Sequence, residues 1–289
     1  MRKYVVKYYE ILMQGEKALD GLAEAKVDAF LLFSEAFHMS RAQYLMRRNE
    51  EITSDTQQYR DWLEQRKRRI PLQYILNSAS FMGYDFYVNE NVLIPRQDTE
   101  VLVEQALNTI KEYKNPKVLD MCTGSGCIAI SMALLSDAQV TAVDISDKAL
   151  EVAACNCKKL SCTNVDLIQS NLFDRIESKF EIIISNPPYI PTKVIDRLEP
   201  EVKNFEPMLA LDGSEDGLEF YRRLAIESKN YLVEGGSLLM EIGCEQANDV
   251  MHLLEVNGYL EISVVKDLAN LDRVVKARWI DGGKKCLIV

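Results

Sequence analysis

The chain has 289 residues, and its hydrophobic content of 47% and charged content of 27% are those of a soluble globular protein. Its length allows one large domain or two ordinary ones, each with its own core. The net charge of −10 disfavours a free nucleic-acid substrate, because neutralisation of phosphate is the main source of such affinity. No apolar run is long enough to span a bilayer and no signal peptide is evident, so we expect a cytoplasmic protein without a membrane partner.

Seven cysteines make an odd count in a chain without an evident export signal, so we expect reduced thiols rather than disulfides. Cys155, Cys157 and Cys162 lie close together but lack the paired spacing of a structural zinc site, and no metal is expected. Residues 66–69, with the sequence Arg-Lys-Arg-Arg, form the one dense basic run. Such runs are most often solvated helix ends, and contact with an acidic partner is the alternative.

Residues 1 to about 70 show helical patterns only. Apolar residues recur at helical spacing over residues 4–12 and again over residues 27–34, and Asp20-Gly21 separates these two stretches. Ser40 is a plausible N-cap, and Ser54-Asp55 opens a further helix that stops before Pro71. The sequence therefore predicts a small bundle of helices over residues 1–74.

The pattern changes after this bundle. Aromatic and apolar residues over 81–88 have strand-like spacing, with Gly83 at a bend, which predicts a β-hairpin between two domains within residues 75–96. Asp98-Thr99-Glu100 then starts a helix that is expected to reach about Tyr113.

From Lys117 onward strands and helices alternate, which is typical of a parallel, doubly wound sheet in an α/β fold. The last two strands have no helix between them and are expected to form an antiparallel edge, and the tail at residues 281–289 receives no structural prediction. The expected strands are 118–121, 139–143, 165–169, 180–185, 237–242, 259–265 and 273–280, and the expected helices lie near 125–135, 147–160, 216–232 and 245–257.

A glycine-rich stretch, residues 120–126, ends one strand and opens a helix. Glycines there allow close backbone approach to a ligand, and a helix N-terminus favours the anionic end of that ligand. Asp144 ends the next strand, 20 residues after Gly124, which is the place for a carboxylate that accepts from ribose hydroxyls. Asn171-Leu172 follows the third strand, where an adenine could rest, and a simple strand-to-loop transition is the alternative.

The loop Asn186-Pro187-Pro188-Tyr189 follows a short apolar strand, and its two prolines stop that strand and stiffen the backbone. The side-chain oxygen of Asn186 and the backbone carbonyl of Pro187 are two acceptors that match the two N–H donors of a planar amino or amide group. Tyr189 adds an aromatic face on which such a group can stack. A proline-rich loop that merely ends a strand is the alternative.

With these features in this order, the sequence resembles S-adenosylmethionine-dependent methyltransferases that act on planar nitrogens. It is most similar to the release factor glutamine methyltransferases, the HemK/PrmC family, and the resemblance extends through nearly the whole chain. The motifs that carry it are Pro71-Leu72-Gln73-Tyr74-Ile75, Val92-Leu93-Ile94-Pro95-Arg96, Asp98-Thr99-Glu100, Gly124-Ser125-Gly126-Cys127-Ile128-Ala129-Ile130, Asn186-Pro187-Pro188-Tyr189-Ile190, Phe205-Glu206-Pro207, Ala210-Leu211-Asp212-Gly213, Asp216-Gly217-Leu218 and Asp272-Arg273-Val274-Val275.

The resemblance implies a Rossmann-like methyltransferase domain over residues 97–289, preceded by the all-α helical bundle (1–74) and a β-hairpin linker (75–96). It implies N5-methylation of the glutamine in the Gly-Gly-Gln motif of peptide chain release factors. S-adenosyl-L-methionine would be the methyl donor and S-adenosyl-L-homocysteine the product, with no metal. The bundle would dock the protein substrate or only stabilise the chain. A monomer that makes no direct contact with nucleic acid is expected.

The family's site residues are carried over position by position. The glycine-rich stretch would line the methionine part of the cofactor, Asp144 would hold the ribose, and the Asn-Leu pair would flank the adenine. The cofactor residues implied in this way are Cys122, Thr123, Gly124, Ser125, Gly126, Asp144, Asn171, Leu172 and Asn186.

The substrate glutamine would be held by Asn186, Pro187, Pro188 and Tyr189, and the catalytic roles would fall to Asn186, Pro187 and Tyr189. Hydrogen bonds from the target amide to the two acceptors would localise the nitrogen lone pair and aim it at the methyl group. No histidine is needed as a base, and His38 and His252 are expected in helices as surface or packing residues.

Two positions depart from the family pattern. Cys122 replaces the usual first glycine of the cofactor loop, which puts the close backbone approach there in doubt. Gln97 replaces a proline that is common after Pro95-Arg96, and this change is expected to loosen the loop without removing any chemistry.

Three other functions fit parts of the pattern. An adenine-N6 DNA methyltransferase needs the same two acceptors for a flipped base, although the acidic catalytic half counts against it. A glutamine in another protein is a further candidate substrate. A non-catalytic module that binds the cofactor or a release factor is the third alternative, and an altered Asn186 or Asp144 would have favoured it.

Overall fold

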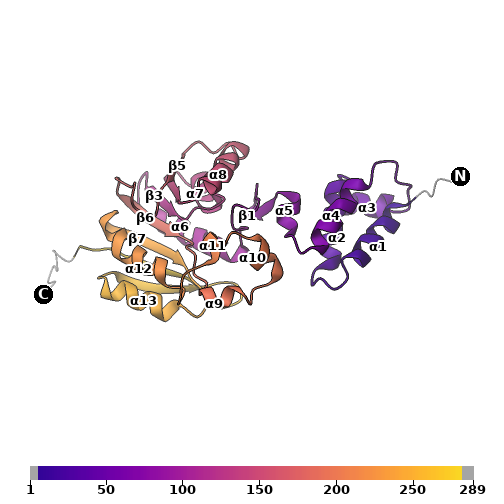
Figure 1. The fold of residues 1–289 in the computed structure, drawn as a ribbon. Helices are drawn as coiled ribbons and strands as arrows, with labels where there is room; N and C mark the ends of the chain where they lie inside the picture. Colours follow the sequence, from indigo (N-terminus) through magenta and orange to yellow (C-terminus); the bar gives the residue numbers. More distant parts are fainter. Residues whose placement is uncertain (1–5, 282–289) are drawn as a thin grey trace. The chain divides into compact units, whose positions relative to one another are not determined.

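The computed structural model describes residues 6–281, and its two compact units are treated separately below. The first unit runs to Asn77 and also contains Glu199–Phe205, and the second contains Ser78–Leu198 and the chain from Glu206 onward. Residues 282–289, most of the tail without a structural prediction, lie outside the described chain. The helices of the first unit are α1 (Tyr8–Ala18), α2 (Ala25–Ala36), α3 (Arg41–Arg47), α4 (Gln57–Lys67), α5 (Leu72–Leu76) and α10 (Pro200–Phe205) (Figure 1).

The first unit is a bundle with an aromatic core, and its helix α3 begins where the sequence indicates. Phe33 and Tyr59 are fully buried, their rings meet edge to face, and the Tyr59 hydroxyl donates to the Ala29 carbonyl at 3.2 Å. Ser40 caps α3 as predicted, because its hydroxyl accepts from the backbone N–H of Gln43. An all-helical unit is therefore confirmed for this part of the chain.

The basic run at the end of α4 is only partly solvated. Lys67 and Arg68 are exposed, but Arg66 is 8% exposed. Its guanidinium donates to Asp28 at 2.7 Å and to Glu201 at 2.9 Å. The expectation of a solvated helix end is thus wrong for Arg66, because carboxylates from α2 and α10 neutralise its charge inside the bundle. The sequence predicted no element at α10.

The second unit contains the β-hairpin, the large sheet and the helices that cover it. Its strands are β1 (Ala79–Phe81), β2 (Tyr84–Phe86), β3 (Lys117–Met121), β4 (Gln139–Asp144), β5 (Val165–Gln169), β6 (Phe180–Ser185), β7 (Leu232–Glu241), β8 (Leu260–Lys266) and β9 (Asp272–Arg278). Its helices are η1 (Gln97–Thr99), α6 (Glu100–Ile110), α7 (Cys127–Leu135), α8 (Asp147–Lys159), α9 (Thr192–Ile195), α11 (Met208–Leu211), α12 (Glu219–Glu227), η2 (Ser228–Asn230) and α13 (Ala247–Val256).

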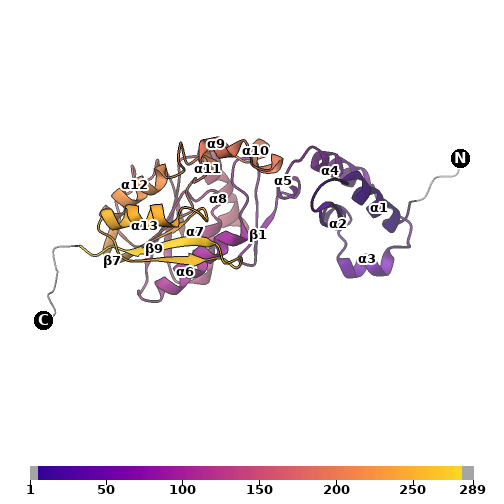
Figure 2. The ribbon, with the colours of Figure 1, turned by 90° about the horizontal axis from the view of Figure 1, so that it is seen from below.

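The sheet has the strand order β5-β4-β3-β6-β7-β9-β8. The first five strands are parallel, and β9 runs antiparallel to both of its neighbours, β7 and β8. Side chains alternate between its faces, as strand geometry requires. Val118 and Ile182 face α6 and α7, whereas Leu119 and Ile183 face α12 and α13. Figure 2 shows α6 and α13 on opposite sides of β9. The doubly wound sheet with an antiparallel edge is confirmed.

The β-hairpin belongs to the second unit. Phe81 and Phe86 are fully buried in the core that also contains α6 and α7. Met82 and Gly83 both have positive φ, at 50° and 79°, as a tight two-residue hairpin turn requires. The segment predicted as a linker therefore contributes to the core of the second unit.

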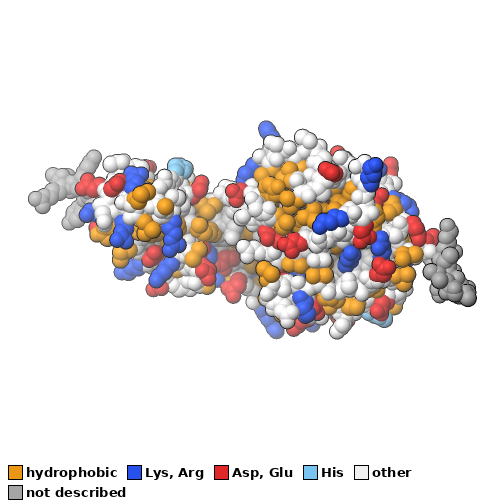
Figure 3. Space-filling view, turned by 180° about the vertical axis from the view of Figure 1, so that it is seen from behind, with side chains coloured by type: hydrophobic (Ala, Val, Ile, Leu, Met, Phe, Trp, Pro, Cys, Tyr) orange, Lys and Arg blue, Asp and Glu red, His pale blue; other side chains and the backbone are white. Residues whose placement is uncertain are grey.

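Several large hydrophobic side chains reach the surface. Met208, Leu209 and Ile145 are each about half exposed, and Figure 3 shows hydrophobic side chains gathered over part of one face of the larger unit. Across residues 6–281, no helix combines the length and the apolar character that crossing a membrane requires.

The buried charges around Arg66 generate a prediction about stability. Arg66→Met leaves Asp28 buried without its cation. We expect the free energy of unfolding of the first unit to fall by about 3 kcal/mol, the cost of breaking a buried ion pair. The chain has two tryptophans, Trp62 in the first unit and Trp279 in the second. Urea unfolding followed by Trp62 fluorescence in a Trp279→Phe background therefore reports on the first unit.

The matched control is Lys67→Met, because Lys67 forms an exposed pair with Glu64 on the same helix. For this control we expect the free energy of unfolding to change by less than about 0.5 kcal/mol. Equal unfolding midpoints for the two variants would contradict the structural role of Arg66.

Candidate active site

The predicted site loops meet at one edge of the sheet because of the order and register of its strands. β3 lies between β4 and β6. From β3 the chain adds β4 and β5 on one side, and it then crosses to β6 on the other side, so the order of the strands reverses at β3 and makes it the topological switch point. Met121 pairs with Val143 on β4 and with Ser185 on β6. The loops that follow these three strands therefore begin side by side.

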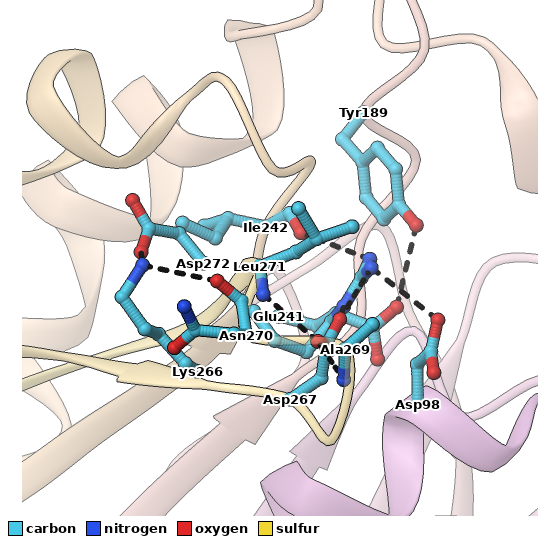
Figure 4. A network of polar contacts seen from close by, with 11 residues as sticks. Asp98, Tyr189, Glu241, Ile242, Lys266, Asp267, Ala269, Asn270, Leu271 and Asp272 are labelled. Atoms are coloured by element: carbon cyan, nitrogen blue, oxygen red, sulfur yellow. Dashed lines mark hydrogen bonds and ion pairs between the residues drawn. The ribbon is translucent and has the colours of Figure 1, made fainter.

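A cavity of about 240 Å³ lies at this edge. The predicted residues that line it are Cys122, Thr123, Gly124, Ser125, Asp144, Asn171, Leu172, Asn186 and Pro188. Three predicted residues are not in its lining. Gly126 caps α7, and an added Cβ there would lie 3.1 Å from the Ala153 side chain, so this glycine permits close helix packing. Pro187 is buried, and the Tyr189 hydroxyl donates to Glu241 (Figure 4).

The glycine-rich turn is held by two carboxylates. Asp120 Oδ2 accepts from the Thr123 hydroxyl and from the backbone N–H of Ala129. Burial raises the pKa of Asp120 to about 7, although these two hydrogen bonds oppose the shift. Asp144 accepts from the backbone N–H of Gly124 at 2.8 Å and from that of Ser146 at 2.9 Å. The turn is therefore fixed against the end of the neighbouring strand.

The structure gives a physical reason why glycine and proline suit the two positions at which this chain departs from the family pattern. Cys122 has φ of 66°, the left-handed region in which glycine has no steric penalty. Burial raises the pKa of its thiol, so the side chain stays neutral. Gln97 occupies the first position of the short helix η1, a position that suits proline because its N–H has no acceptor within the helix.

The loop after β5 contributes a polar contact that the sequence did not indicate. Asn171 accepts from the Arg223 guanidinium at 3.1 Å, and both residues line the cavity. Leu172 is 4% exposed and adds an apolar wall. Arg223 lies on α12, 52 residues further along the chain. Nothing in its local sequence distinguishes it from other surface arginines.

The amide of Asn186 is oriented by a residue from another element. Its side-chain nitrogen donates to the hydroxyl oxygen of Thr99 at 3.3 Å. Thr99 ends η1, is 3% exposed and also lines the cavity. Because the nitrogen is directed to Thr99, the side-chain oxygen of Asn186 is the atom left to accept from a ligand.

The loop after Asn186 is held by backbone and amide contacts. The N–H of Ile190 donates to the Leu211 carbonyl, and the Ile190 carbonyl accepts from Gly213 at 2.9 Å. The side-chain nitrogen of Gln246 donates to the Tyr189 carbonyl at 3.1 Å and to the Gly217 carbonyl at 3.2 Å. Gln246 was not among the predicted residues, since an isolated glutamine between a strand and a helix carries no local signal.

An ion pair between a half-exposed arginine and a buried glutamate supports another part of the cavity. Arg96, which lines the cavity, is paired with Glu206, whose side chain is 1% exposed. Glu206 also accepts from the backbone N–H of Ile94. Burial raises the pKa of Glu206, and the Arg96 charge opposes that shift. Over the described residues, no group of three or more His, Cys, Asp or Glu side chains is placed to hold a metal ion.

The fold and the site together define a Rossmann-like, S-adenosylmethionine-dependent methyltransferase. Residues 97–198 match the family model of the methyltransferase small domain, and residues 10–76 match that of the PrmC N-terminal domain. The release factor glutamine methyltransferase of Clostridium acetobutylicum is 42% identical over 86% of this chain and 90% of its own length. The release factor glutamine methyltransferase of Geobacter sulfurreducens is 38% identical over 92% of this chain and 93% of its own length. The chain therefore belongs to the family of release factor glutamine methyltransferases.

Solved structures agree on the fold. A methyltransferase from Pyrococcus furiosus has a TM-score of 0.50 at 17% identity and covers 69% of this chain and 90% of its own. The T. thermophilus 16S rRNA methyltransferase RsmC, solved with AdoMet and guanosine, has a TM-score of 0.50 at 15% identity over 70% of this chain and 49% of its own. At this level of identity the likeness concerns the fold alone.

The packing behind the Asn-Pro-Pro-Tyr loop generates a second prediction. A Cβ at Gly213 would lie 2.7 Å from the Cα of Tyr189 and 2.8 Å from its carbonyl carbon. Gly213→Ala must therefore displace the loop, and a shift of about 1 Å can reduce turnover about 100-fold. Methyltransferase activity under saturating cofactor measures this effect. Glu215→Ala, an exposed change in the same turn, is the control and should keep wild-type turnover. Full activity of the Gly213 variant would show that the loop position is not critical.

Proposed function

We propose that this protein transfers a methyl group from S-adenosyl-L-methionine to the side-chain amide nitrogen (N5) of the glutamine in the Gly-Gly-Gln motif of peptide chain release factors. The observation that carries the proposal is the Asn186 amide, whose nitrogen is held by Thr99 at the switch point and whose oxygen is thereby left to accept from a substrate amide. Membership of the release factor glutamine methyltransferase family identifies the protein class that would supply this amide.

A primary amide nitrogen is a poor nucleophile because its lone pair is delocalised into the carbonyl. When bound, S-adenosyl-L-methionine supplies a methyl group on a sulfonium, which is already strongly electrophilic. The task of the protein is therefore to hold the amide in one orientation and to keep electron density on its nitrogen. Positioning of this kind lowers a barrier by roughly 7–11 kcal/mol in well-oriented intramolecular cases.

Two acceptors perform this task in the proposal. The side-chain oxygen of Asn186 and the backbone carbonyl of Pro187 accept the two N–H groups of the substrate glutamine, and Pro188 and Tyr189 complete the walls of its site. A buried Pro187 and a loop held by Gln246 limit how far these acceptors can move. The amide then presents its lone pair in one direction.

The cavity has the chemistry that the cofactor requires. Gly124 faces open space, so its backbone is approachable by the methionine part. Each Asp144 oxygen accepts one backbone N–H and has a second lone pair for a ribose hydroxyl. Leu172 offers an apolar face to the adenine, beside the polar edge of Asn171. Cys122, Thr123 and Ser125 complete the proposed cofactor site, and Gly126 supports it by allowing α7 to pack closely.

The proposal also assigns a role to the N-terminal helices. Residues 1–74 dock the release factor, and residues 97–289 carry the chemistry, with the hairpin region 75–96 between them. The match of residues 10–76 to the PrmC N-terminal domain supports this assignment. Under the proposal, the protein acts in the cytoplasm, where its substrate is found.

The first test concerns the substrate amide. Asn186→Ala removes one of the two acceptors, and we expect at least a 100-fold loss of methyl transfer to a purified release factor, in line with the loss of one preorganised transition-state contact. Cofactor binding, measured by calorimetry, should weaken far less. A release factor with Gln→Ala in its Gly-Gly-Gln motif should receive no methyl group. Wild-type turnover by the Asn186 variant would overturn the proposal.

The second test concerns the cofactor. Asp144→Ala removes the proposed ribose acceptor and one anchor of the glycine-rich turn, and we expect S-adenosylmethionine affinity to fall about ten-fold or more, the value of one to two charge-assisted hydrogen bonds. Asp147→Ala is the control, since Asp147 is an exposed aspartate three residues away on α8. Equal affinities for the two variants would remove Asp144 from the cofactor site.

A further inference from the structure

Asn156 is a fully buried polar side chain that does not itself line the cavity. It lies in the interior of α8 and is 0% exposed. Asparagine is not a favourable helix former, and a buried carboxamide costs free energy unless its hydrogen bonds are made. The contacts of this side chain therefore show what the helix is holding.

The Asn156 carboxamide bridges two backbone segments. Its oxygen accepts from the Tyr87 N–H at 2.6 Å, and its nitrogen donates to the carbonyls of Tyr87 and Ser125, both at 2.9 Å. A backbone N–H can only donate and a carbonyl can only accept, so these contacts permit one orientation of the carboxamide. Asn156 thus joins the chain after the β-hairpin to the glycine-rich turn.

Close packing of α8 on the turn brings Asn156 within reach of it. Asn156 follows Ala153 by three residues, so the two side chains lie on one face of the helix. An added Cβ at Gly126 would lie 3.1 Å from the Ala153 side chain, which shows how closely the turn and the helix approach. The glycine that permits this approach therefore also places the carboxamide at the Ser125 carbonyl.

At the turn, Asn156 helps to fix one peptide group at both its oxygen and its nitrogen. The peptide between Ser125 and Gly126 has its oxygen on Asn156, and its N–H donates to the Thr123 carbonyl at 2.9 Å. This peptide cannot rotate without breaking both hydrogen bonds. Since Thr123 and Ser125 line the cavity, the contact holds part of the cavity wall in place.

At its other contact, the carboxamide fixes the start of a second part of the wall. Residues 91–93 line the cavity and follow Tyr87 closely in the chain. Asn89 closes the turn between them, because its side-chain oxygen accepts from the Asn91 N–H at 3.0 Å and its carbonyl accepts from the Val92 N–H at 3.2 Å. The position of Tyr87 is thereby passed on to the residues that face the cavity.

We propose that Asn156 is a positioning residue for the cofactor, because it holds the glycine-rich turn and the segment after the hairpin at a fixed separation. This inference rests on the proposed function, in which the turn takes the methionine part of S-adenosyl-L-methionine. Asn156 itself touches neither cofactor nor substrate. Without it, the two parts of the wall shift independently, and the cavity fits the cofactor less tightly.

Asn156→Asp in the full-length protein tests this inference. Aspartate keeps the shape and the acceptor for the Tyr87 N–H, but it supplies at most one donor for the two carbonyls, and none when ionised. We expect the Kd for S-adenosylmethionine, measured by calorimetry, to rise about ten-fold or more. The KM for the cofactor should rise in parallel, while kcat with a release factor at saturating cofactor changes less than about three-fold, as for a contact that acts on binding alone.

Asn164→Asp is the matched control. The side-chain nitrogen of Asn164 also donates to two backbone carbonyls, those of Ala133 at 3.2 Å and Ala138 at 2.8 Å, and none of these three residues lines the cavity. Both substitutions should lower the free energy of unfolding, because each leaves carbonyls without a donor. Only Asn156→Asp should weaken cofactor binding. Equal Kd values for the two variants would overturn the inference.

A second pair of variants covers the case in which Asn156→Asp does not fold. Asn156→Ser retains one hydroxyl donor and leaves room for a water molecule, and Asn164→Ser is its control. We expect the same contrast in cofactor Kd between the two positions. A wild-type Kd for Asn156→Ser would contradict the role of Asn156.

Amide exchange in the wild-type protein supplies a readout that needs no variant. The Tyr87 N–H exchanges with solvent only when its hydrogen bond to Asn156 opens. Bound cofactor disfavours this opening if the bridge shapes the cofactor site, so saturating S-adenosylhomocysteine should slow exchange of this amide about ten-fold or more. The same exchange rate with and without the ligand would count against the bridge.

These readouts separate the inference from the proposed function. Weaker cofactor binding by Asn156→Asp than by Asn164→Asp, with no methylation of release factors by the wild type, supports the role of Asn156 and rejects only the proposed substrate. Methylation of release factors by the wild type, with equal cofactor Kd values for the two variants, rejects the role of Asn156 alone.

Discussion

The pairing of β3 with β6 is the constraint on which the site depends. Because Met121 lies beside Ser185, the glycine-rich turn and the Asn-Pro-Pro-Tyr loop leave the sheet at neighbouring points and turn toward the same edge. The buried aliphatic residues of these strands fix the register, since a slip by one residue would move each of them to the opposite face. The core thus determines how far the proposed cofactor residues lie from the proposed substrate residues.

Around this edge, carboxylates are buried to hold backbone and hydroxyl groups in place. Desolvation raises the pKa of Asp120, Asp144, Glu206 and Glu241 above their ordinary values. A carboxyl whose folded-state pKa is raised binds its proton more tightly in the folded state. The loss of folding stability that it causes is therefore absent at low pH and grows until the pH passes the folded-state pKa. For Asp120 and Glu241 that pKa is about 7. These buried carboxylates therefore lower the stability of the fold near neutral pH, and they hold acceptors in fixed positions, a balance common at functional sites.

Much of the fold could be predicted because its signals are local. The N-cap at Ser40, the glycine-rich turn and the acid at the end of β4 each lie within a few residues of the element that they serve. The positioning contacts are of another kind: Thr99 and Asn186 are 87 residues apart, and Arg66 and Glu201 are 135 apart. No periodicity or spacing encodes such pairs, since only the folded chain brings them together. The short helices α9 to α11 were missed for a related reason, because four to six residues are too few to show a helical period.

Cys122 and Asn186 show which parts of the site tolerate change. The turn at Cys122 acts through its backbone, and a left-handed conformation costs a non-glycine residue roughly 1–2 kcal/mol, a penalty that the surrounding hydrogen bonds to Asp120 and Asp144 can offset. In the proposed function, the side-chain oxygen of Asn186 accepts from the substrate amide while its nitrogen donates to Thr99, and no other residue type reproduces both contacts. A departure from the family pattern is therefore compatible with function where the backbone makes the contact. Under the proposed function it would not be compatible at Asn186, where the carboxamide accepts from the substrate on one side and donates to Thr99 on the other.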